Sequence, residues 1–153
     1  LKRCGGKFKP IEGGYRFERS LLKATEIDLA DCPDLGPILF TLGCFCNGST
    51  VIRNAGRLRL KESDRVASVI AMVEALGGKA QASEDTLTVY GTGLVGGTVD
   101  AMNDHRIAMS AAIAATACKA PVAILGAECV GKSYPKFFEE YARLGGNYEQ
   151  YLR

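Results

Sequence analysis

The sequence predicts an α/β fold built from repeated βαβαββ units, and three observations support this prediction. A Gly-Gly pair recurs at 5–6, 77–78 and 145–146, at spacings of 72 and 68 residues. An amphipathic helical pattern precedes the second and third pairs, and an uncharged helical segment lies upstream of each pattern. Short runs rich in β-branched residues separate the helical segments, so each unit contains a strand, a helix, a strand, a helix and two further strands.

The two amphipathic patterns have the i, i+3, i+4, i+7 spacing of a helix with one buried face. They consist of Val66, Val69, Ile70, Val73 and Leu76, and of Tyr134, Phe137, Phe138, Tyr141 and Leu144. We expect the first helix to begin at an N-cap formed by Ser63 and the second at an N-cap formed by Ser133. Each helix should end at its Gly pair, because glycine suits the left-handed residue that follows a helix.

The two upstream helical segments, 35–46 and 107–118, contain no charged residue. A helix without a polar stripe is buried on all sides, so we expect both segments to lie in the core. The predicted strands lie at 25–28, 50–53, 87–90, 98–100 and 122–125. We therefore interpret the chain as one partial domain, in which 1–20 is the tail of one unit, 25–92 is a complete unit and 97–153 is the final unit.

The composition is that of a globular protein, with 47% of the 153 residues hydrophobic and 24% charged. It excludes the disordered and fibrous classes, and no uncharged run reaches the length of a membrane span, about 20 apolar residues. The net charge is only +2 with both signs interspersed, which argues against a nucleic-acid-binding surface despite one basic cluster. That cluster consists of Arg53, Arg57, Arg59, Lys61 and Arg65. We therefore expect neither nucleic acid nor a membrane as a partner.

The six cysteines form no CxxC pair and the chain has a single histidine, so the sequence predicts no metal site. Cysteines of this kind are typical of reduced, mostly buried thiols in a cytoplasmic protein. The chain opens with Leu1 rather than Met and shows no signal sequence. We interpret it as a piece of a longer chain.

Two charged residues, Asp34 and Arg106, stand 72 positions apart at the N-terminal ends of the two uncharged helical segments. Such helix ends attract anions, and Arg106 would strengthen an anion site there. Spacing alone favours Asp34 as an N-cap or first-turn acid over a catalytic residue.

The loop at 55–64 is the most charged part of the chain. A binding function requires Lys61, Arg65, Arg106 and Lys132 to converge, because several cations together hold a phosphate or carboxylate best. The alternative is a solvated charged turn. His105 is a candidate acid or base, although a lone histidine at a helix start is more often a cap or a packing residue.

Four motifs point to a known family. They are DCPD at 31–34, KESDR at 61–65, NDHRIAMS at 103–110 and CVGKSYP at 129–135. In this order they closely resemble the C-terminal part of the 5-enolpyruvylshikimate-3-phosphate synthases, also called 3-phosphoshikimate 1-carboxyvinyltransferases. The match departs from the family at Arg57, where many members carry Asn.

The resemblance implies a transferase of the shikimate pathway, which leads to chorismate and the aromatic amino acids. The family transfers the enolpyruvyl group of phosphoenolpyruvate to the 5-hydroxyl of shikimate 3-phosphate and releases phosphate. It uses no metal or organic cofactor, and glyphosate occupies its phosphoenolpyruvate site. Members have two domains of three βαβαββ units each, with the active site between them. The chain would then hold about two units of the C-terminal domain, lack the N-terminal domain of the same protein and be inactive alone.

For catalysis, the resemblance implies roles for three residues. Asp34 would contact the shikimate ring hydroxyls and is the candidate to take the attacking proton. Lys61 would touch the nucleophilic hydroxyl and the phosphate side of shikimate 3-phosphate, and Glu62 would deliver a proton to the methylene carbon of phosphoenolpyruvate. Addition and elimination between two anionic substrates needs an acid, a base and charge clamps, which these residue types supply.

For substrate binding, the resemblance implies that Arg65, Arg106 and Lys132 hold the carboxylate and the phosphate of phosphoenolpyruvate. His105 belongs to the same motif and is grouped with the substrate-binding residues, without a specific role.

Two alternatives are compatible with these patterns. A sibling enolpyruvyl transferase that acts on UDP-N-acetylglucosamine shares the fold but lacks the KESDR and NDHR motifs. A non-catalytic repeat module would bind anions without chemistry. The expected location is the cytoplasm, or the plastid for a plant protein.

Overall fold

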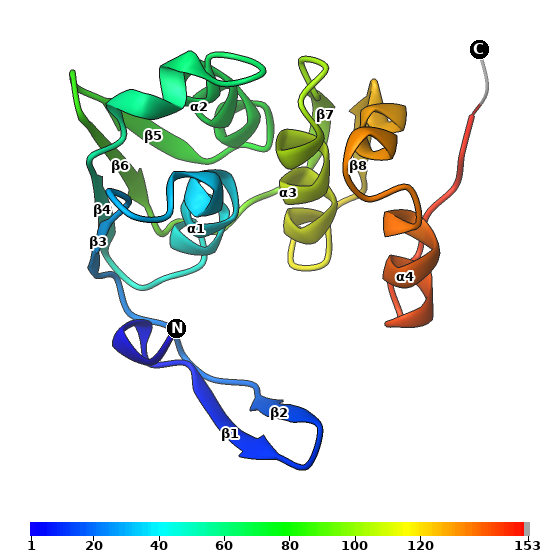
Figure 1. Cartoon of the computed structure of the whole chain (residues 1–153), viewed down its shortest axis with the longest axis horizontal. Coiled ribbons are helices and arrows are strands. Elements are labelled where there is room, and N and C mark those ends of the chain that lie inside the picture. The colour runs from blue at the N-terminus through cyan, green and yellow to red at the C-terminus, as the bar shows by residue number, and fades with distance from the viewer. Residues whose placement is uncertain (152–153) are drawn as a thin grey trace.

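The computed structural model describes residues 1–151, and it begins with a β-hairpin that projects away from the rest of the chain (Figure 1). A short 3-10 helix, Lys2–Cys4, leads into strand β1 (Lys7–Ile11), which pairs antiparallel with β2 (Gly14–Glu18). The aromatic rings of Phe8 and Phe17 stack on one face of this hairpin.

The middle of the chain has the predicted order of strand, helix, strand, helix and two strands. Its elements are β3 (Glu26–Asp28), α1 (Gly36–Gly43), β4 (Ser49–Arg53), α2 (Arg65–Ala75), β5 (Lys79–Ala82) and β6 (Thr86–Tyr90). The four strands form one sheet in the order β3-β4-β6-β5, in which only the β3-β4 pair is parallel.

The last part of the described chain repeats the first four of these elements. They are β7 (Gly97–Asp100), α3 (His105–Ala115), β8 (Val122–Leu125) and α4 (Phe137–Arg143), and β7 pairs parallel with β8. The final unit predicted at 97–153 extends two residues beyond the described part. Within residues 1–151, no helix is long and apolar enough to cross a bilayer.

The 72-residue repeat extends to individual hydrogen bonds. Asp28 ends β3 and its Oδ1 accepts the backbone N–H of Ala30 at 2.8 Å. Asp100 ends β7 and its Oδ1 accepts the N–H of Met102 at 2.8 Å. The two units therefore share this Asp hydrogen bond at the end of their first strands, and Asp34 and Arg106 are each the second residue of the helix that follows.

The core forms where α1 and α2 cover the four-stranded sheet and where α3 packs against both helices. Its central side chains are fully buried and include Phe40, Ile52, Leu58, Val69 and Leu87. A smaller cluster joins α3 to α4 through residues that include Ala108 and Phe137. This packing holds the N-terminal ends of α2 and α3 together on one side of the molecule.

The uncharged helices are buried nearly as predicted. No residue of α1 is exposed, and in α3 only Ile113 is, at 42%. The predicted apolar face of α2 is also buried. On α4 the prediction is wrong for Leu144, the residue after the helix, which is 83% exposed. It is also wrong for Tyr134, which lies before the helix and is 44% exposed.

The predicted helix ends are confirmed at the C-termini and wrong at the N-termini. Gly77 and Gly145 follow α2 and α4 with φ of 78° and 95°. Ser63 is not the cap of α2, because Asp64 accepts the first free N–H groups of that helix. Ser133 does not cap α4, which starts at Phe137; Pro135 restricts the residue before it to extended backbone and so delays the helix.

Replacement of Gly77 by Ala should lower the free energy of unfolding by about 1–2 kcal/mol, the cost of a left-handed residue that carries a Cβ. The new Cβ would also lie 3.2 Å from Val95 Cγ2. Gly131→Ala is the control, because that glycine has no positive φ and open space around it. Urea unfolding followed by circular dichroism measures both variants. Equal midpoints for the two would contradict the assigned role of Gly77.

Candidate active site

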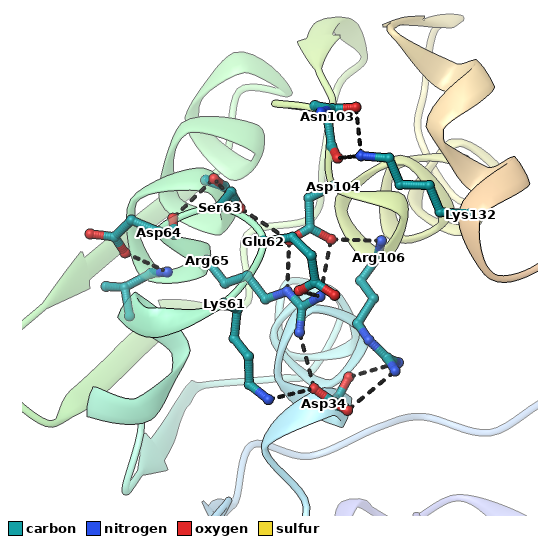
Figure 2. A network of polar contacts seen from close by, with 12 residues as sticks. Asp34, Lys61, Glu62, Ser63, Asp64, Arg65, Asn103, Asp104, Arg106 and Lys132 are labelled. Carbon is teal, nitrogen blue, oxygen red and sulfur yellow. Dashed lines mark hydrogen bonds and ion pairs between the residues drawn. The ribbon is translucent and has the colours of Figure 1, made fainter.

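The centre of the site is the carboxylate of Asp34, which three cations contact (Figure 2). Its Oδ1 lies 3.2 Å from Lys61 Nζ and 3.0 Å from Arg65 Nη1. Its Oδ2 lies 3.3 Å from Arg106 Nη2, and Arg106 Nη1 also donates to the Asp34 carbonyl at 3.2 Å. Three of the four cations predicted to converge therefore do so, and they meet on an acid of the chain itself.

The ends of neighbouring elements bring these groups together. Asp34 lies in the 3-10 helix Pro33–Leu35 that leads into α1, Lys61 precedes α2, and Arg106 is the second residue of α3. Of the two structural roles predicted for Asp34, the N-cap is wrong, because α1 has no side-chain cap. Asp34 is instead an acid in the first turn of the 3-10 helix, and its carboxylate faces the cations. The hydrogen bond from Lys61 is the main reason that the pKa of Asp34 lies below its ordinary value.

Arg65 is fully buried and joins the whole site. Its Nε donates to Asp104 Oδ2 at 2.7 Å, its Nη1 to Asp34, and its Nη2 to Glu62 Oε2 at 2.5 Å. All three guanidinium nitrogens thus already hold carboxylates. A substrate anion would reach Arg65 only by replacing one of these carboxylates.

Asp104 is the buried counter-charge of Arg65, and our reading of the sequence missed it. Its side chain also accepts Ser63 Oγ at 3.1 Å and the backbone N–H of Arg106 at 2.9 Å, so it caps α3 as well. Burial would raise the pKa of Asp104, but the hydrogen bonds from Arg65 and Arg106 outweigh burial and lower it. Its place directly before an apolar helical pattern is the N-cap signal that could have identified it.

Glu62 lies beside Asp34 with Arg65 between the two acids. Its side chain is 46% exposed, in contrast to the fully buried Arg65 that holds it. Asp34 and Glu62, the two acids to which the family resemblance assigns proton transfers, thus share one buried cation. Both remain open to solvent and therefore to a ligand.

Lys132 stands apart from the other three cations, so the prediction that all four converge on one point is only partly correct. Lys132 Nζ donates to the backbone oxygen and to Oδ1 of Asn103, both at 2.7 Å. Figure 2 shows this pair at the start of α3, on the far side of Asp104 from Asp34. Arg59, from the basic cluster that includes Lys61 and Arg65, pairs with Asp64 at 3.4 Å on the surface.

His105 is the first residue of α3 and is only 6% exposed. It is not a cap, because Asp104 holds that position. Its Nδ1 is buried and has no hydrogen-bond partner within residues 1–151. Over the same residues, the His, Cys, Asp and Glu side chains form no group of three or more that could hold a metal ion.

Comparison with known proteins identifies the family. The sequence profile of EPSP synthase (3-phosphoshikimate 1-carboxyvinyltransferase) matches residues 1–141. The chain belongs to the EPSP synthase family. The resemblance seen in its motifs is therefore confirmed, and with it the repeated α/β fold.

Relatives in the EPSP synthase family are longer than this chain. It is 40% identical to the 3-phosphoshikimate 1-carboxyvinyltransferase of Clostridium botulinum over 99% of the chain but 36% of the relative, and 41% identical to that of Clostridium acetobutylicum. The structure of EPSP synthase from Acinetobacter baumannii matches with a TM-score of 0.84 and 28% identity, over 96% of this chain and 38% of that one. The enolpyruvyl transferase NikO from Streptomyces tendae, at 23% identity and a TM-score of 0.76, shares the fold.

Replacement of Asp104 by Asn should lower the free energy of unfolding at pH 7 by about 3–5 kcal/mol, because it leaves Arg65 buried without its main counter-charge. Asn still caps a helix well, so the cap is not the cause. Because the pKa of Asp104 is lower in the folded chain than its ordinary value of 3.8, its charge stabilises the fold at pH values above 3.8. This stabilisation is lost as the pH falls through the pKa of Asp104 in the folded state.

The acid sensitivity of the Asp104→Asn variant should therefore be weaker than that of the parent below about pH 4. Urea unfolding at a series of pH values measures both effects. The exposed Asp31→Asn is the control. If Asp104→Asn is as stable as Asp31→Asn at pH 7, the buried ion pair between Arg65 and Asp104 does not stabilise the fold as argued.

Proposed function

We propose that the protein containing this chain transfers the enolpyruvyl group of phosphoenolpyruvate to the 5-hydroxyl of shikimate 3-phosphate and releases phosphate. The observation that carries the proposal is the convergence of Lys61, Arg65 and Arg106 on Asp34, beside Glu62. Both substrates are polyanions, and such a cluster of donors suits them. Membership of the EPSP synthase family and the names of its relatives support the same reaction.

In the proposed mechanism, binding begins with an exchange of carboxylates. The carboxylate of phosphoenolpyruvate replaces Asp34 on Arg65 and Arg106, so the buried Arg65 and the partly exposed Arg106 each keep an anionic partner. Asp34 and Lys61 are then free to contact the hydroxyls of shikimate 3-phosphate. The phosphate of phosphoenolpyruvate lies toward Lys132, and His105 belongs to the same wall of the site.

In the proposed chemistry, the attacking 5-hydroxyl gives its proton to Asp34 while Glu62 protonates the methylene carbon of phosphoenolpyruvate. A tetrahedral intermediate forms. The C–O bond to phosphate then breaks, and the leaving phosphate takes up the proton that Asp34 accepted. The new methyl group returns a proton to Glu62, which restores the carbon-carbon double bond and both acids. Arg65 keeps Glu62 at a fixed place through this exchange, which gives the proton transfer to the methylene carbon a defined geometry.

The chain supplies only part of this site in the proposal. It spans about a third of the length of the relatives that it matches. We propose that 25–92 is one complete repeat unit, that 1–20 and 97–153 belong to its neighbours in the same domain, and that the rest of the longer protein supplies the opposite wall. The 153-residue chain alone should then release no phosphate from the two substrates.

A chimaera tests the proposal. In it, this chain replaces the matching residues of the Clostridium botulinum relative, and phosphate release is measured with both substrates. We expect turnover that requires shikimate 3-phosphate. Consumption of UDP-N-acetylglucosamine instead would assign the sibling reaction, and binding of phosphoenolpyruvate without turnover would indicate a non-catalytic module.

Glu62→Gln in the chimaera should lower kcat by about 10²–10⁴-fold, the usual contribution of a positioned acid, with a smaller change in KM. Glu74→Gln is the matched control: it makes the same change of charge at an exposed site on α2. Steady-state kinetics with varied phosphoenolpyruvate separate kcat from KM. Equal kcat values for the two variants would exclude Glu62 as the proton donor.

We propose a cytoplasmic location for the protein. The six cysteines are all free, and Cys4, Cys44, Cys46 and Cys129 are buried, as expected of a reducing compartment. Fractionation of cells that express the full-length protein tests this, and recovery with the membrane fraction would contradict it.

A further inference from the structure

We propose that Asn103 is a positioning residue: its two oxygens hold Lys132 in place without neutralising it, so that the ammonium is ready for the phosphate of the substrate. The inference rests on the proposed function and deepens it at the phosphate side of the site. It starts from the contact of Lys132 Nζ with the backbone oxygen and Oδ1 of Asn103, both at 2.7 Å.

The contact fixes a flexible side chain. An ammonium group has three N–H donors, and Asn103 accepts two of them, which leaves one for a ligand. Two bonds to one residue also hold the end of the lysine at a single place, although the side chain is exposed. A ligand that meets a fixed ammonium has less conformational entropy to remove on binding.

The backbone that makes this contact possible departs from the repeat. Met102 and Asn103 have φ of 51° and 55°, a left-handed conformation that is rare for residues other than glycine. Their counterparts in the preceding unit, Ala30 and Asp31, do not have positive φ, although both units share the Asp hydrogen bond described above. At this point of the repeat, the left-handed backbone thus occurs only in the unit that carries the contact between Asn103 and Lys132. Unusual backbone of this kind is concentrated at functional sites.

The charge balance separates Lys132 from the other cations. Lys61, Arg65 and Arg106 each contact the carboxylate of Asp34. Lys132, by contrast, is held by neutral oxygens and forms no ion pair within residues 1–151. An incoming phosphate needs to displace no carboxylate from Lys132, so the positive charge there acts on it directly.

The test compares Asn103→Asp and Asn103→Gly in the chimaera described above. Aspartate and glycine both tolerate left-handed backbone, so if Asn103 served only to form the turn, neither variant would change the kinetics. Asp keeps an oxygen at the same place but neutralises Lys132. Gly removes Oδ1 and keeps the backbone oxygen. We expect Asn103→Asp to raise KM for phosphoenolpyruvate by about tenfold or more, the worth of one charge-assisted contact, with kcat changed far less.

Asn103→Gly should raise the same KM by a smaller factor, because one of the two contacts survives. Two controls accompany these variants. Asn47→Asp adds the same charge at an exposed residue before the start of β4. Met102→Asn eases the left-handed turn and leaves Asn103 and Lys132 unchanged. Both controls should retain the parental KM. Circular dichroism and thermal unfolding establish that each variant is folded.

The outcomes separate this inference from the proposed function. A parental chimaera without turnover argues against the proposed function. Binding of inorganic phosphate, followed by the ¹H–¹⁵N signal of the Lys132 ammonium, then tests Asn103 directly and should weaken in Asn103→Asp. If Asn103→Asp matches Asn47→Asp in KM or, in an inactive chimaera, in phosphate binding, Asn103 does not prepare Lys132 for the ligand.

Discussion

The buried ion pair between Arg65 and Asp104 is the interaction on which the rest of the site depends. Arg65 is removed from water entirely, so its charge requires a partner inside the protein, and Asp104 supplies one from the next repeat unit. The same carboxylate caps α3 and therefore fixes where that helix begins. One interaction thus joins the start of α2 to the start of α3 and places Arg106 opposite Asp34.

This pair produces a site that contains its own anions. Around it, Lys61, Arg65 and Arg106 are balanced by carboxylates. Balance of this kind keeps like charges together in a folded chain without a bound ligand, since each cation has a partner. In the proposed mechanism, a substrate carboxylate is therefore exchanged for a side chain rather than simply added. Lys132, which neutral oxygens hold, is the exception, and it adds a charge that needs no exchange.

Most of the fold could be predicted from the sequence, because helices, strands and C-terminal glycines leave patterns within a few residues of one another. The N-termini of α2 and α4 were predicted wrongly. Ser63 precedes α2 at a plausible cap position, yet Asp104 accepts its hydroxyl from 41 residues away in the chain, and Asp64 forms the cap. Before α4, Pro135 outweighed the apparent cap at Ser133 and moved the helix start to Phe137. Local patterns therefore failed where a distant partner or a backbone restriction competed with them.

The sequence by itself determined the repeat, the order of its elements and the family, because the KESDR and NDHR motifs are contiguous and specific. It also placed acids and cations at the helix starts where the site forms. Only the tertiary structure decided which charges are buried and which partner each one takes. Arg65 and Asp104 are 39 residues apart, and nothing in either segment specifies the other. The physical reason is that a buried charge pairs with the group that the packing of α1, α2 and α3 brings within reach. The periodicity of the sequence does not predict how close two distant residues lie in space.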